Sequence, residues 1–438
     1  MRRGPLRHRR GTVGHGRRIG VDRDVLRVRD QAPLDQPRRH RAVAGAQLED
    51  AQRPPRRPRH DVGPEQIEHV AVERGIAEFR SGRPTVITWG GVAALALPVD
   101  GMTDTRLAAF RRLCAPVEPH LVITERRAQA LGLPGTGPTG LAVAGDDAAA
   151  IVALAADARV ERGLEVVQPG PVAGAAIELA KLAQRMPALL VADATKAEPC
   201  DPPLMTVAAD AITRFRQTAI ESLAVAAEAD VPINGGVSAR FVIFRDAIGG
   251  SSVAVIVGSP DLREPVPLRL HSACLTGDVF GSRRCDCGDQ LRLALRRLEE
   301  QGGGVILYLE QEGRGLGLAN KMRAYQLQDA GLDTIDANSA LGFDDDERDY
   351  GVAVRMLQIL GVKRVKLLTN NPAKLDGLIQ AGIEVSGRIP LHGPVNSDNR
   401  RYLTAKATRA GHKLDHLLAA LAEPVDAAEA PVATERAP

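Results

Sequence analysis

Residues 269–291 have the sequence RLHSACLTGDVFGSRRCDCGDQL, which is the most informative segment of the chain for predicting its fold and chemistry. It holds three of the five cysteines, Cys274, Cys285 and Cys287. Thiolates bind zinc tightly, and a catalytic zinc typically has three protein ligands with water in the fourth position. The segment has no fourth Cys, so an open, catalytic metal site fits it. The alternatives are three buried free thiols, or a structural site completed by a ligand from elsewhere in the chain, for example His271.

Four further motifs follow this segment in order. They are residues 311–318 (QEGRGLGL) with Asn320 and Lys321, 324–329 (AYQLQD), 341–343 (LGF) with 346–349 (DERD), and 367–372 (LLTNNP). Together with residues 269–291, these motifs resemble GTP cyclohydrolase II, the zinc enzyme that opens the guanine ring of GTP in the first step of riboflavin biosynthesis. The resemblance runs from about residue 238 to about residue 415 without an evident gap.

The resemblance implies a set of ligands for metal and substrate. Cys274, Cys285 and Cys287 would hold one zinc ion per chain, which lowers the pKa of its water toward about 7. Mg²⁺ is expected with the phosphates of GTP. The GTP-binding positions of the family fall on Arg269, Leu270, His271, Ser272, Ala273, Gln290, Glu312, Gly313, Arg314, Thr334, Thr369 and Lys374.

The resemblance also implies catalytic roles. Asp346 would act as proton acceptor, Arg348 as a nucleophile or a phosphate clamp, and Tyr325 would assist ring opening and loss of formate. Because Arg is a poor nucleophile at its ordinary pKa, clamping is the easier role for Arg348. From the residues alone, Asp346 and Arg348 could instead form a loop ion pair, and Tyr325 could be a packing residue on a helix.

Physical chemistry supports several of these positions. A triphosphate carries several negative charges. The planar guanidinium of Arg, the ammonium of Lys and backbone N–H groups that come close at glycines can all bind its oxygens. The carboxylate of Glu312 can accept from both N1–H and the 2-amino group of guanine, the alternative being a solvated loop charge. One position departs from the family, which commonly has Glu before the first zinc cysteine where this chain has Ala273.

The preceding segment, residues 65–232, has the pattern of a mixed α and β domain. Spacing predicts helices near residues 67–79, 105–113, 146–156, 173–184 and 205–227, and strands at 85–89 and 188–192. Residues 71–78 (AVERGIAE), 81–84 (SGRP) and 175–180 (AAIELA) resemble 3,4-dihydroxy-2-butanone-4-phosphate synthase. That enzyme needs an acidic metal-binding loop and a Gly-His-Thr motif, yet residues 89–99 hold no acid and 170–174 hold no His. We therefore expect a degenerate, structural domain.

The two ends of the chain read differently. Residues 1–64 are rich in Arg and Pro and lack apolar periodicity, so we expect them to be disordered, as we do residues 423–438. Seventeen Arg against six acidic residues in the first sixty make this segment basic, although the whole chain carries only +3. Upstream sequence translated from too early a start codon explains such a segment better than a nucleic-acid-binding arm or a transit peptide.

These features together predict an α+β protein. Residues 65–232 would form the degenerate domain and 233–422 a GTP cyclohydrolase II domain with a mixed sheet and flanking helices, opened by a hairpin around Gly249 and Gly250. Apolar runs too short for a membrane span and an odd number of cysteines favour a cytoplasmic enzyme. The family is usually homodimeric. The alternatives are a bifunctional enzyme that also makes dihydroxybutanone phosphate, and a non-enzymatic protein that binds zinc and nucleotide.

Overall fold

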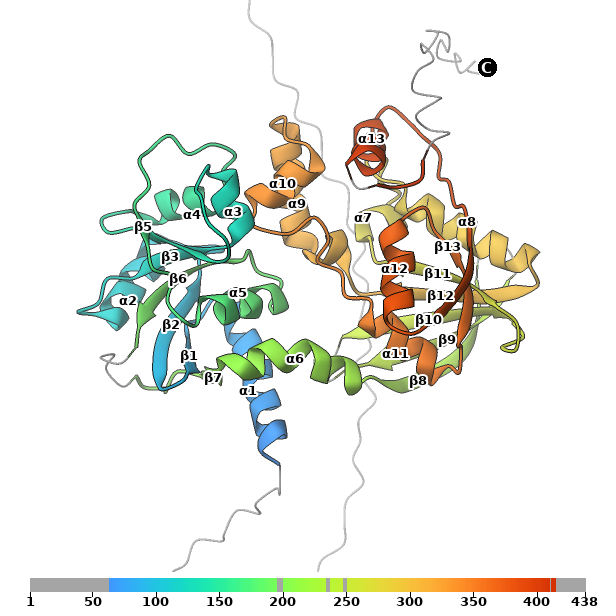
Figure 1. The fold of residues 1–438 in the computed structure, drawn as a ribbon, viewed down its shortest axis with the longest axis horizontal. Coiled ribbons are helices and arrows are strands. Elements are labelled where there is room, and N and C mark those ends of the chain that lie inside the picture. Colours follow the sequence, from blue (N-terminus) through green and yellow to red (C-terminus); the bar gives the residue numbers. More distant parts are fainter. Residues whose placement is uncertain (1–62, 195–199, 234–236, 247–249, 410, 415–438) are drawn as a thin grey trace, which may run out of the picture. The chain divides into compact units, whose positions relative to one another are not determined.

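The computed structural model describes residues 63–194, 200–233, 237–246, 250–409 and 411–414 (Figure 1). The predicted disordered segments therefore lie outside the described residues, apart from Gly63 and Pro64. Two seven-stranded sheets carry the fold, with strand orders β5-β4-β3-β6-β2-β1-β7 and β14-β13-β11-β12-β10-β9-β8. Both sheets are mixed and both are flanked by helices, which confirms the predicted mixed α and β architecture.

The first sheet and its helices occupy residues 64–221. Its strands are β1 (Thr85–Trp89), β2 (Val92–Pro98), β3 (His120–Ile123), β4 (Thr139–Ala142), β5 (Val166–Val167), β6 (Ala188–Asp193) and β7 (Thr206–Ala208). Its helices are α1 (Pro64–Arg80), α2 (Asp104–Cys114), α3 (Glu125–Ala130), α4 (Ala148–Ala156), α5 (Ala173–Leu182) and α6 (Ala209–Glu221). Because side chains alternate along a strand, β6 sends Leu190 into one apolar core and Leu189 into a second.

Most elements predicted for this region are present, and one is wrong. The predicted helix at 205–227 is instead β7, the shorter helix α6 and the start of β8. Residues 206–208 pair in parallel with β1, and β8 (Ala224–Pro232) pairs with β9 (Ser238–Arg245). These long-range strand pairings override the local helical pattern.

The second sheet is built from residues 224–389. Its strands are β8 (Ala224–Pro232), β9 (Ser238–Arg245), β10 (Ser251–Gly258), β11 (Val266–Ser272), β12 (Gly303–Leu309), β13 (Arg364–Leu368) and β14 (Glu384–Ile389). Its helices are α7 (Leu275–Asp278), α8 (Cys287–Glu300), α9 (Leu318–Asp329), α10 (Thr334–Ala340), α11 (Gly351–Ile359), α12 (Pro372–Gln380) and α13 (Arg400–Thr408), with a 3₁₀ turn, η1 (Glu312–Gly315). The predicted hairpin is confirmed as β9 and β10, although its turn at 247–249 lies outside the described residues.

The parallel strands of the second sheet bring the motifs together. β11 runs parallel to both β12 and β13, with Ser272 opposite Leu309 and Leu268 opposite Leu367. The carboxyl ends of parallel strands meet at one edge of a sheet, where α/β proteins bind their ligands. The segments that begin near residues 273, 310 and 369, each carrying a motif, therefore start at this edge.

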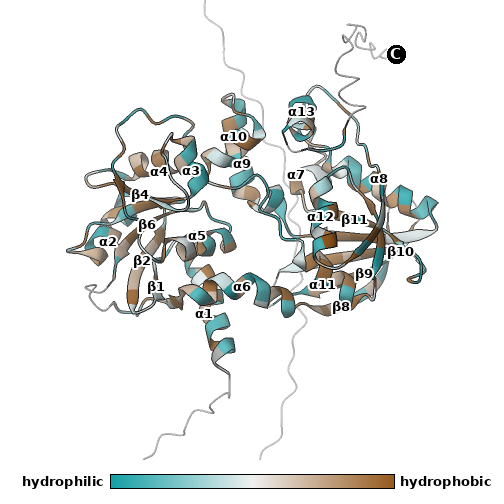
Figure 2. Ribbon diagram, viewed as in Figure 1, coloured by the Kyte–Doolittle hydropathy of each residue, from teal (hydrophilic) through white to brown (hydrophobic). Residues whose placement is uncertain are grey.

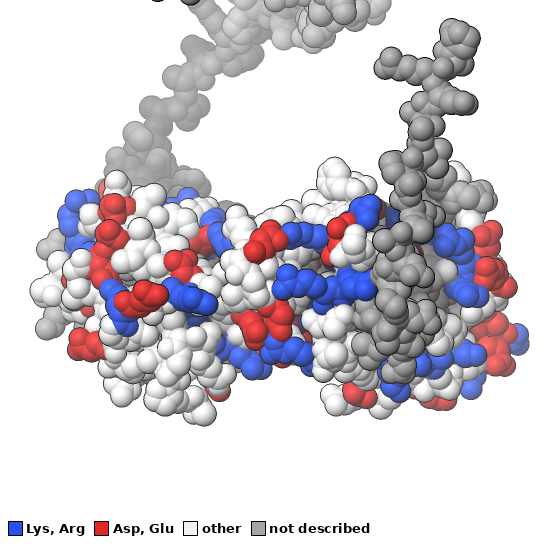
Figure 3. Space-filling model, turned by 90° about the horizontal axis from the view of Figure 1, so that it is seen from above, with Lys and Arg blue, Asp and Glu red and all other residues white. Residues whose placement is uncertain are grey.

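The segment of α9 and α10 packs against the first sheet. Leu316, Ala324, Leu341 and Phe343 belong to the same buried apolar cluster as Leu95, and Figure 2 shows apolar residues on the ribbon of both helices and of the strands. Lys and Arg are intermixed with Asp and Glu over the face in Figure 3. None of the helices in the described part of the chain is both long and apolar enough to cross a membrane.

Candidate active site

A cavity opens at the carboxyl edge of β11, β12 and β13, with about 1110 Å³ of empty space including its open mouth. The predicted positions that line it are Arg269, His271, Ser272, Ala273, Cys274, Cys285, Cys287, Gln290, Glu312, Gly313, Arg314, Tyr325, Thr334, Arg348, Thr369 and Lys374. Two predicted residues do not line the cavity. Leu270 is buried in β11, where its carbonyl accepts a 2.8 Å hydrogen bond from the Lys374 Nζ. Asp346 lies beside Arg348 and contacts it directly.

The three cysteine thiols form a cluster at this edge. The Sγ atoms of Cys274, Cys285 and Cys287 all lie within 4.8 Å of one another, and those of Cys274 and Cys285 are 3.7 Å apart. A Cβ added at Gly277 would lie 2.9 Å from the Cys285 Sγ and 3.1 Å from the Cys274 Sγ. This glycine thus keeps clear the space among the sulfurs, and three converging thiols of this kind fit a zinc ion.

His271 is not part of the thiol cluster, so the described residues do not support it as a fourth ligand. Its Nε2 lies 3.1 Å from the Oδ1 of the buried Asp278. The same carboxylate accepts from the backbone N–H of Cys274 and from the hydroxyl of Tyr308, each at 2.9 Å. Asp278 therefore fixes the position of Cys274 through its backbone N–H, in the way that carboxylates hydrogen-bonded to metal ligands orient those ligands.

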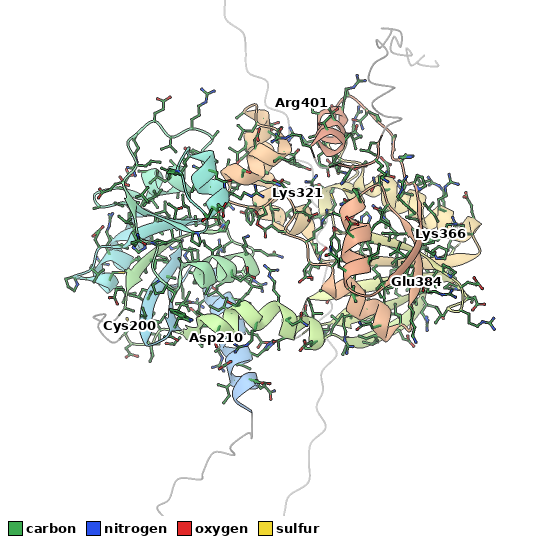
Figure 4. All side chains as sticks on the ribbon, viewed as in Figure 1. Cys200, Asp210, Lys321, Lys366, Glu384 and Arg401 are labelled. Carbon is green, nitrogen blue, oxygen red and sulfur yellow. The ribbon has the colours of Figure 1, made fainter. Side chains whose placement is uncertain are left out.

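Lys321, which Figure 4 labels on α9, joins the thiols to Glu312. Its ammonium donates to the Cys274 Sγ at 3.1 Å, the Thr276 Oγ1 at 2.9 Å and the Glu312 Oε1 at 2.8 Å. Hydrogen bonds from the two neighbouring thiols, together with this ammonium, lower the pKa of Cys274. The sulfur that would first become a thiolate is therefore the one beside a fixed positive charge.

Glu312 is the predicted guanine reader, and both of its carboxylate oxygens are engaged. Oε1 accepts from Lys321 and from the Gly313 N–H at 3.0 Å, and Oε2 accepts from the Leu275 N–H at 2.7 Å. The side chain is mostly buried, so it is not a solvated loop charge. A carboxylate has about four acceptor positions, which leaves capacity for a ligand.

Positive side chains converge on one part of the cavity. Arg269 and Lys374 are both buried, and burial lowers the pKa of Arg269 to about 10. Burial, reinforced by the charges of Arg269 and Arg348, holds the pKa of Lys374 well below its ordinary value. Among the described residues, neither Arg269 nor Lys374 has an ion-pair partner, and two cations kept this close favour an anionic ligand that removes their mutual repulsion.

Arg348 and Asp346 form an ion pair. The Arg348 Nε donates to the Asp346 Oδ1 at 2.6 Å and its Nη2 donates to Oδ2. Burial alone would lower the pKa of Arg348, but the bonds to Asp346 outweigh it and the pKa is raised. The structure thus contains the loop ion pair that was one alternative, and it places the arginine of that pair on the cavity wall.

The turn that carries Arg314 has an uncommon backbone. Arg314 has φ +64°, in the left-handed region that residues other than glycine seldom adopt, and Gly313 before it has the same φ. The carbonyl of Arg314 accepts from the Glu347 N–H at 3.1 Å, and its Nη1 donates to the Asp345 carbonyl at 3.3 Å. The turn is therefore tied to the loop that bears Asp346 and Arg348.

Tyr325 lies on α9 one turn after Lys321. Burial raises the pKa of its hydroxyl, so the group stays protonated and can donate a hydrogen bond. The Arg284 guanidinium and the Lys321 ammonium lie 5.0 and 5.8 Å from the centre of its ring. Tyr325 faces the cavity, so it is not solely a packing residue.

Sequence reasoning missed several residues of the cavity wall. They are Asp286, Lys321, Asn338, Asn370, Asn371, Tyr402, Lys406 and His412. Some of these stand inside motifs, as Lys321 does in Asn320-Lys321, and motif membership was a signal that could have identified them. Tyr402, Lys406 and His412 lie beyond the last motif, and only the folded chain brings them to the cavity.

Comparisons with known proteins agree on one family. A family model described as GTP cyclohydrolase II matches residues 224–390. The chain is 41% identical over 360 residues to GTP cyclohydrolase-2 of Azospirillum brasilense, covering 78% of this chain and 93% of the relative. It is 50% identical over 196 residues to GTP cyclohydrolase-2 of Azotobacter vinelandii, covering 45% of this chain and 94% of the relative.

Two further matches carry other names. The riboflavin biosynthesis protein RibBA of Porphyromonas gingivalis is 46% identical over 205 residues, which cover 47% of this chain and 50% of the relative. Among solved structures, a crystal structure of RibBX, a two-domain 3,4-dihydroxy-2-butanone 4-phosphate synthase from A. baumannii, covers 73% of this chain and 99% of its own. Its sequence identity is 17% and its TM-score 0.27.

Proposed function

Because the chain belongs to the GTP cyclohydrolase II family of enzymes, we propose that it hydrolyses GTP to 2,5-diamino-6-(5-phosphoribosylamino)pyrimidin-4-one, formate and pyrophosphate. This reaction is the first step of riboflavin biosynthesis. The observation that carries the proposal is the cluster of Cys274, Cys285 and Cys287 at the edge of a cavity whose other walls hold unbalanced positive charge. A zinc ion held by three thiolates supplies a nucleophilic hydroxide near neutral pH.

The residues beside the thiols are suited to hold the guanine. Glu312 is fixed by Lys321 and by two backbone N–H groups, so its carboxylate is already oriented when the base arrives. A preorganised acceptor loses little entropy on binding. The protonated hydroxyl of Tyr325 can donate a proton or a hydrogen bond as the ring opens.

The positive residues are suited to hold the triphosphate. Arg269, Lys374 and Arg348 offer two planar forks and one point charge. The raised pKa of Arg348 argues against its acting as a nucleophile, because a nucleophile would have to lose its proton. We therefore assign it the role of clamp for the phosphates and for the departing pyrophosphate.

Mg²⁺ would enter with the substrate. Among the described residues, the three cysteines are the only cluster of His, Cys, Asp and Glu side chains with the spacing of a metal site. A magnesium ion usually takes few protein ligands and several phosphate oxygens and waters. Its binding to the phosphates of GTP is consistent with this arrangement.

The bifunctional alternative has less support. The described part of residues 64–221 contains no cluster of carboxylates or histidines with metal-site spacing. Residues 85–98, which follow the first helix, form the β1–β2 hairpin and carry no acidic side chain. We propose that this region is a structural partner of the cyclohydrolase, and we expect ribulose 5-phosphate to go unconverted with or without Mg²⁺.

The test is turnover of GTP by purified, zinc-loaded protein, followed by formate release and by the ultraviolet spectrum of the product. We expect about one zinc per chain and loss of both metal and activity in Cys285→Ser. Cys114→Ala, which alters a buried thiol in the core of the first sheet, is the matched control and should keep both. GTP that stays intact with the zinc-loaded wild-type protein would refute the proposed reaction.

A further inference from the structure

The helix α13 and residues 411–414 form a wall of the cavity. They contribute Tyr402, Lys406, His412 and Leu414 to it. The helix is anchored to other parts of the site as well. The Arg409 guanidinium pairs with the carboxylates of Asp333 and Asp336 around the start of α10, and the Lys413 N–H donates to the Asn370 carbonyl at 2.9 Å. The end of the described chain is thus integrated into the active-site region.

Lys406 makes the innermost contact of this helix. Its Nζ lies 2.9 Å from the Asp286 Oδ1, and both residues are buried, with 9% and 2% of their surface exposed. The same ammonium lies 4.2 Å from the centre of the Tyr402 ring. Asp286 stands between Cys285 and Cys287, so Lys406 is bonded to the residue that joins two of the three thiols.

The contact continues from Asp286 to the arginine proposed to hold phosphate. The second oxygen of Asp286 accepts from the Gln290 Nε2 at 2.5 Å, and the Gln290 Oε1 accepts from the Arg269 Nη2 at 2.6 Å. The Arg269 Nη1 donates to the Leu368 carbonyl at 3.0 Å. Arg269 is thereby fixed on two sides, while its buried Nε has no hydrogen-bond partner among the described residues.

Stability alone gives little reason for such a pair. Removing two charges from water costs free energy that their attraction often only balances, so a buried ion pair is weak evidence for stabilisation. What the pair does provide is a fixed position for Asp286, because its two oxygens are bonded to different partners. Networks of this kind orient metal ligands and substrate-binding groups.

We propose that Lys406 is a positioning residue of the active site. It fixes Asp286, which holds the Cys285 and Cys287 loop in place, and through Gln290 it orients the Arg269 guanidinium toward the triphosphate. One residue of α13 thus serves both the metal-binding and the phosphate-binding parts of the cavity. This inference rests on the function proposed above.

The experiment compares Lys406→Met with Lys406→Arg in the full chain. Methionine keeps a long apolar stem but leaves the Asp286 carboxylate unpaired, whereas arginine keeps a cation. We expect Lys406→Met to lower kcat/KM for GTP about 10–100-fold, mostly through KM, and to weaken zinc binding by a similar factor in competition with a chelator. Lys406→Arg should recover most of both losses. If Lys406→Met does not fold, Lys406→Gln, which still donates to Asp286 but carries no charge, should show the same two losses in part.

Arg409→Met is the matched control, because it removes another anchor of α13 without touching Asp286. Its ion pairs are partly exposed, so we expect little change in kcat/KM or zinc affinity. The inference is overturned if Lys406→Met, or Lys406→Gln in its place, retains wild-type values, or if Arg409→Met loses as much. A wild-type protein that does not turn over GTP would refute the proposed reaction instead, and the zinc competition would still report on Lys406.

Discussion

Arg127 offers the sharpest test of how the two sheets depend on each other. It lies on α3, is 1% exposed, and donates to four backbone carbonyls. Its Nε bonds to Leu154 at 2.8 Å and its Nη2 to Ala153 at 3.0 Å, both at the end of α4. Its Nη1 bonds at 2.9 Å to Asp157 and at 2.9 Å to Ala340, the last residue of α10. One guanidinium thus caps the C-terminal ends of two helices.

The cost of removing Arg127 follows from these bonds. Carbonyls at the end of a helix have no partner within the helix, and the helix dipole there favours a cation. Each buried carbonyl left unpaired costs about 1–3 kcal/mol, although water can reach some of the four. We therefore expect Arg127→Met to lower the free energy of unfolding by about 3–5 kcal/mol, in the range seen when one partner of a buried charged network is removed.

Its chain neighbour Arg126 is the control. Arg126 forms an ion pair with Asp344, but the side chains are 42% and 52% exposed. Exposed pairs contribute at most about 1 kcal/mol, so Arg126→Met should change the unfolding free energy by no more than that. Urea unfolding followed by far-ultraviolet circular dichroism measures both variants. Equal destabilisation of the two would show that Arg127 does not hold α4 and α10 together as the contacts indicate.

Three other outcomes test the site directly. Gly277→Ala should lose zinc, because the new Cβ would lie 2.9 Å from the Cys285 Sγ. Metal analysis measures the loss, and Gly174→Ala is the control, because a Cβ at that position has no neighbouring atom within 4 Å. Tyr325→Phe should still release pyrophosphate while formate release falls about 10²-fold, and equal loss of both products would remove its acid–base role. GTP binding should take up protons at a pH between the Lys374 pKa of the free protein and that of the complex, because burial and neighbouring arginines hold this pKa well below its ordinary value and the arriving triphosphate raises it. Calorimetry in two buffers of different ionisation enthalpy measures the uptake, which Lys374→Met should abolish.

Most of the residues predicted for the site line one cavity, and the sequence could name them because the family motifs are local. The motifs at residues 269–291, 311–318 and 367–372 span or follow the carboxyl ends of parallel strands, so the strand register brings them to one cavity. The motif at 324–329 lies on α9, and residues 346–349 lie in the loop after α10. Resemblance could therefore name Cys274 and Lys374 although a hundred residues separate them. It could not show that Leu270 contributes its carbonyl rather than its side chain, since that depends on where Lys374 reaches across the sheet.

The remaining misses have physical reasons too. The segment 205–227 has helical spacing, but both of its ends form strands. Its first residues pair with β1, about 120 residues earlier in the chain, and its last residues pair with β9, about 15 residues later. Lys406 and Tyr402 belong to a short polar helix with no metal or phosphate motif, and the role proposed for Lys406 depends on its contact with Asp286, 120 residues earlier in the chain. The pattern of apolar residues within one segment cannot predict which distant segment it pairs with.

The packing of α9 and α10 suggests a structural role for the first sheet. This segment carries Lys321, Tyr325 and Thr334, yet several of its apolar side chains, among them Ala324 and Ala337, are buried in the core of the first sheet. The loop after α10 is held from the same side, since the Thr124 Oγ1 donates to the Gly342 carbonyl at 2.7 Å and the Lys181 Nζ lies 2.7 Å from the Glu347 Oε1.

A region whose described residues form no cluster with metal-site spacing can still support a neighbouring active site in this way. If the first sheet were absent, the apolar faces of α9 and α10 would be exposed to water at a cost of about 25 cal/mol for each Å². The groups proposed to read guanine and clamp phosphate must be placed to within about half an ångström. The contacts with Thr124, Arg127 and Lys181 supply that placement for one wall of the cavity, just as Lys406 supplies it for the opposite end of the site through Asp286. Two walls of the cyclohydrolase cavity are thus positioned by elements outside the second sheet, one by the first sheet and its helices and the other by α13.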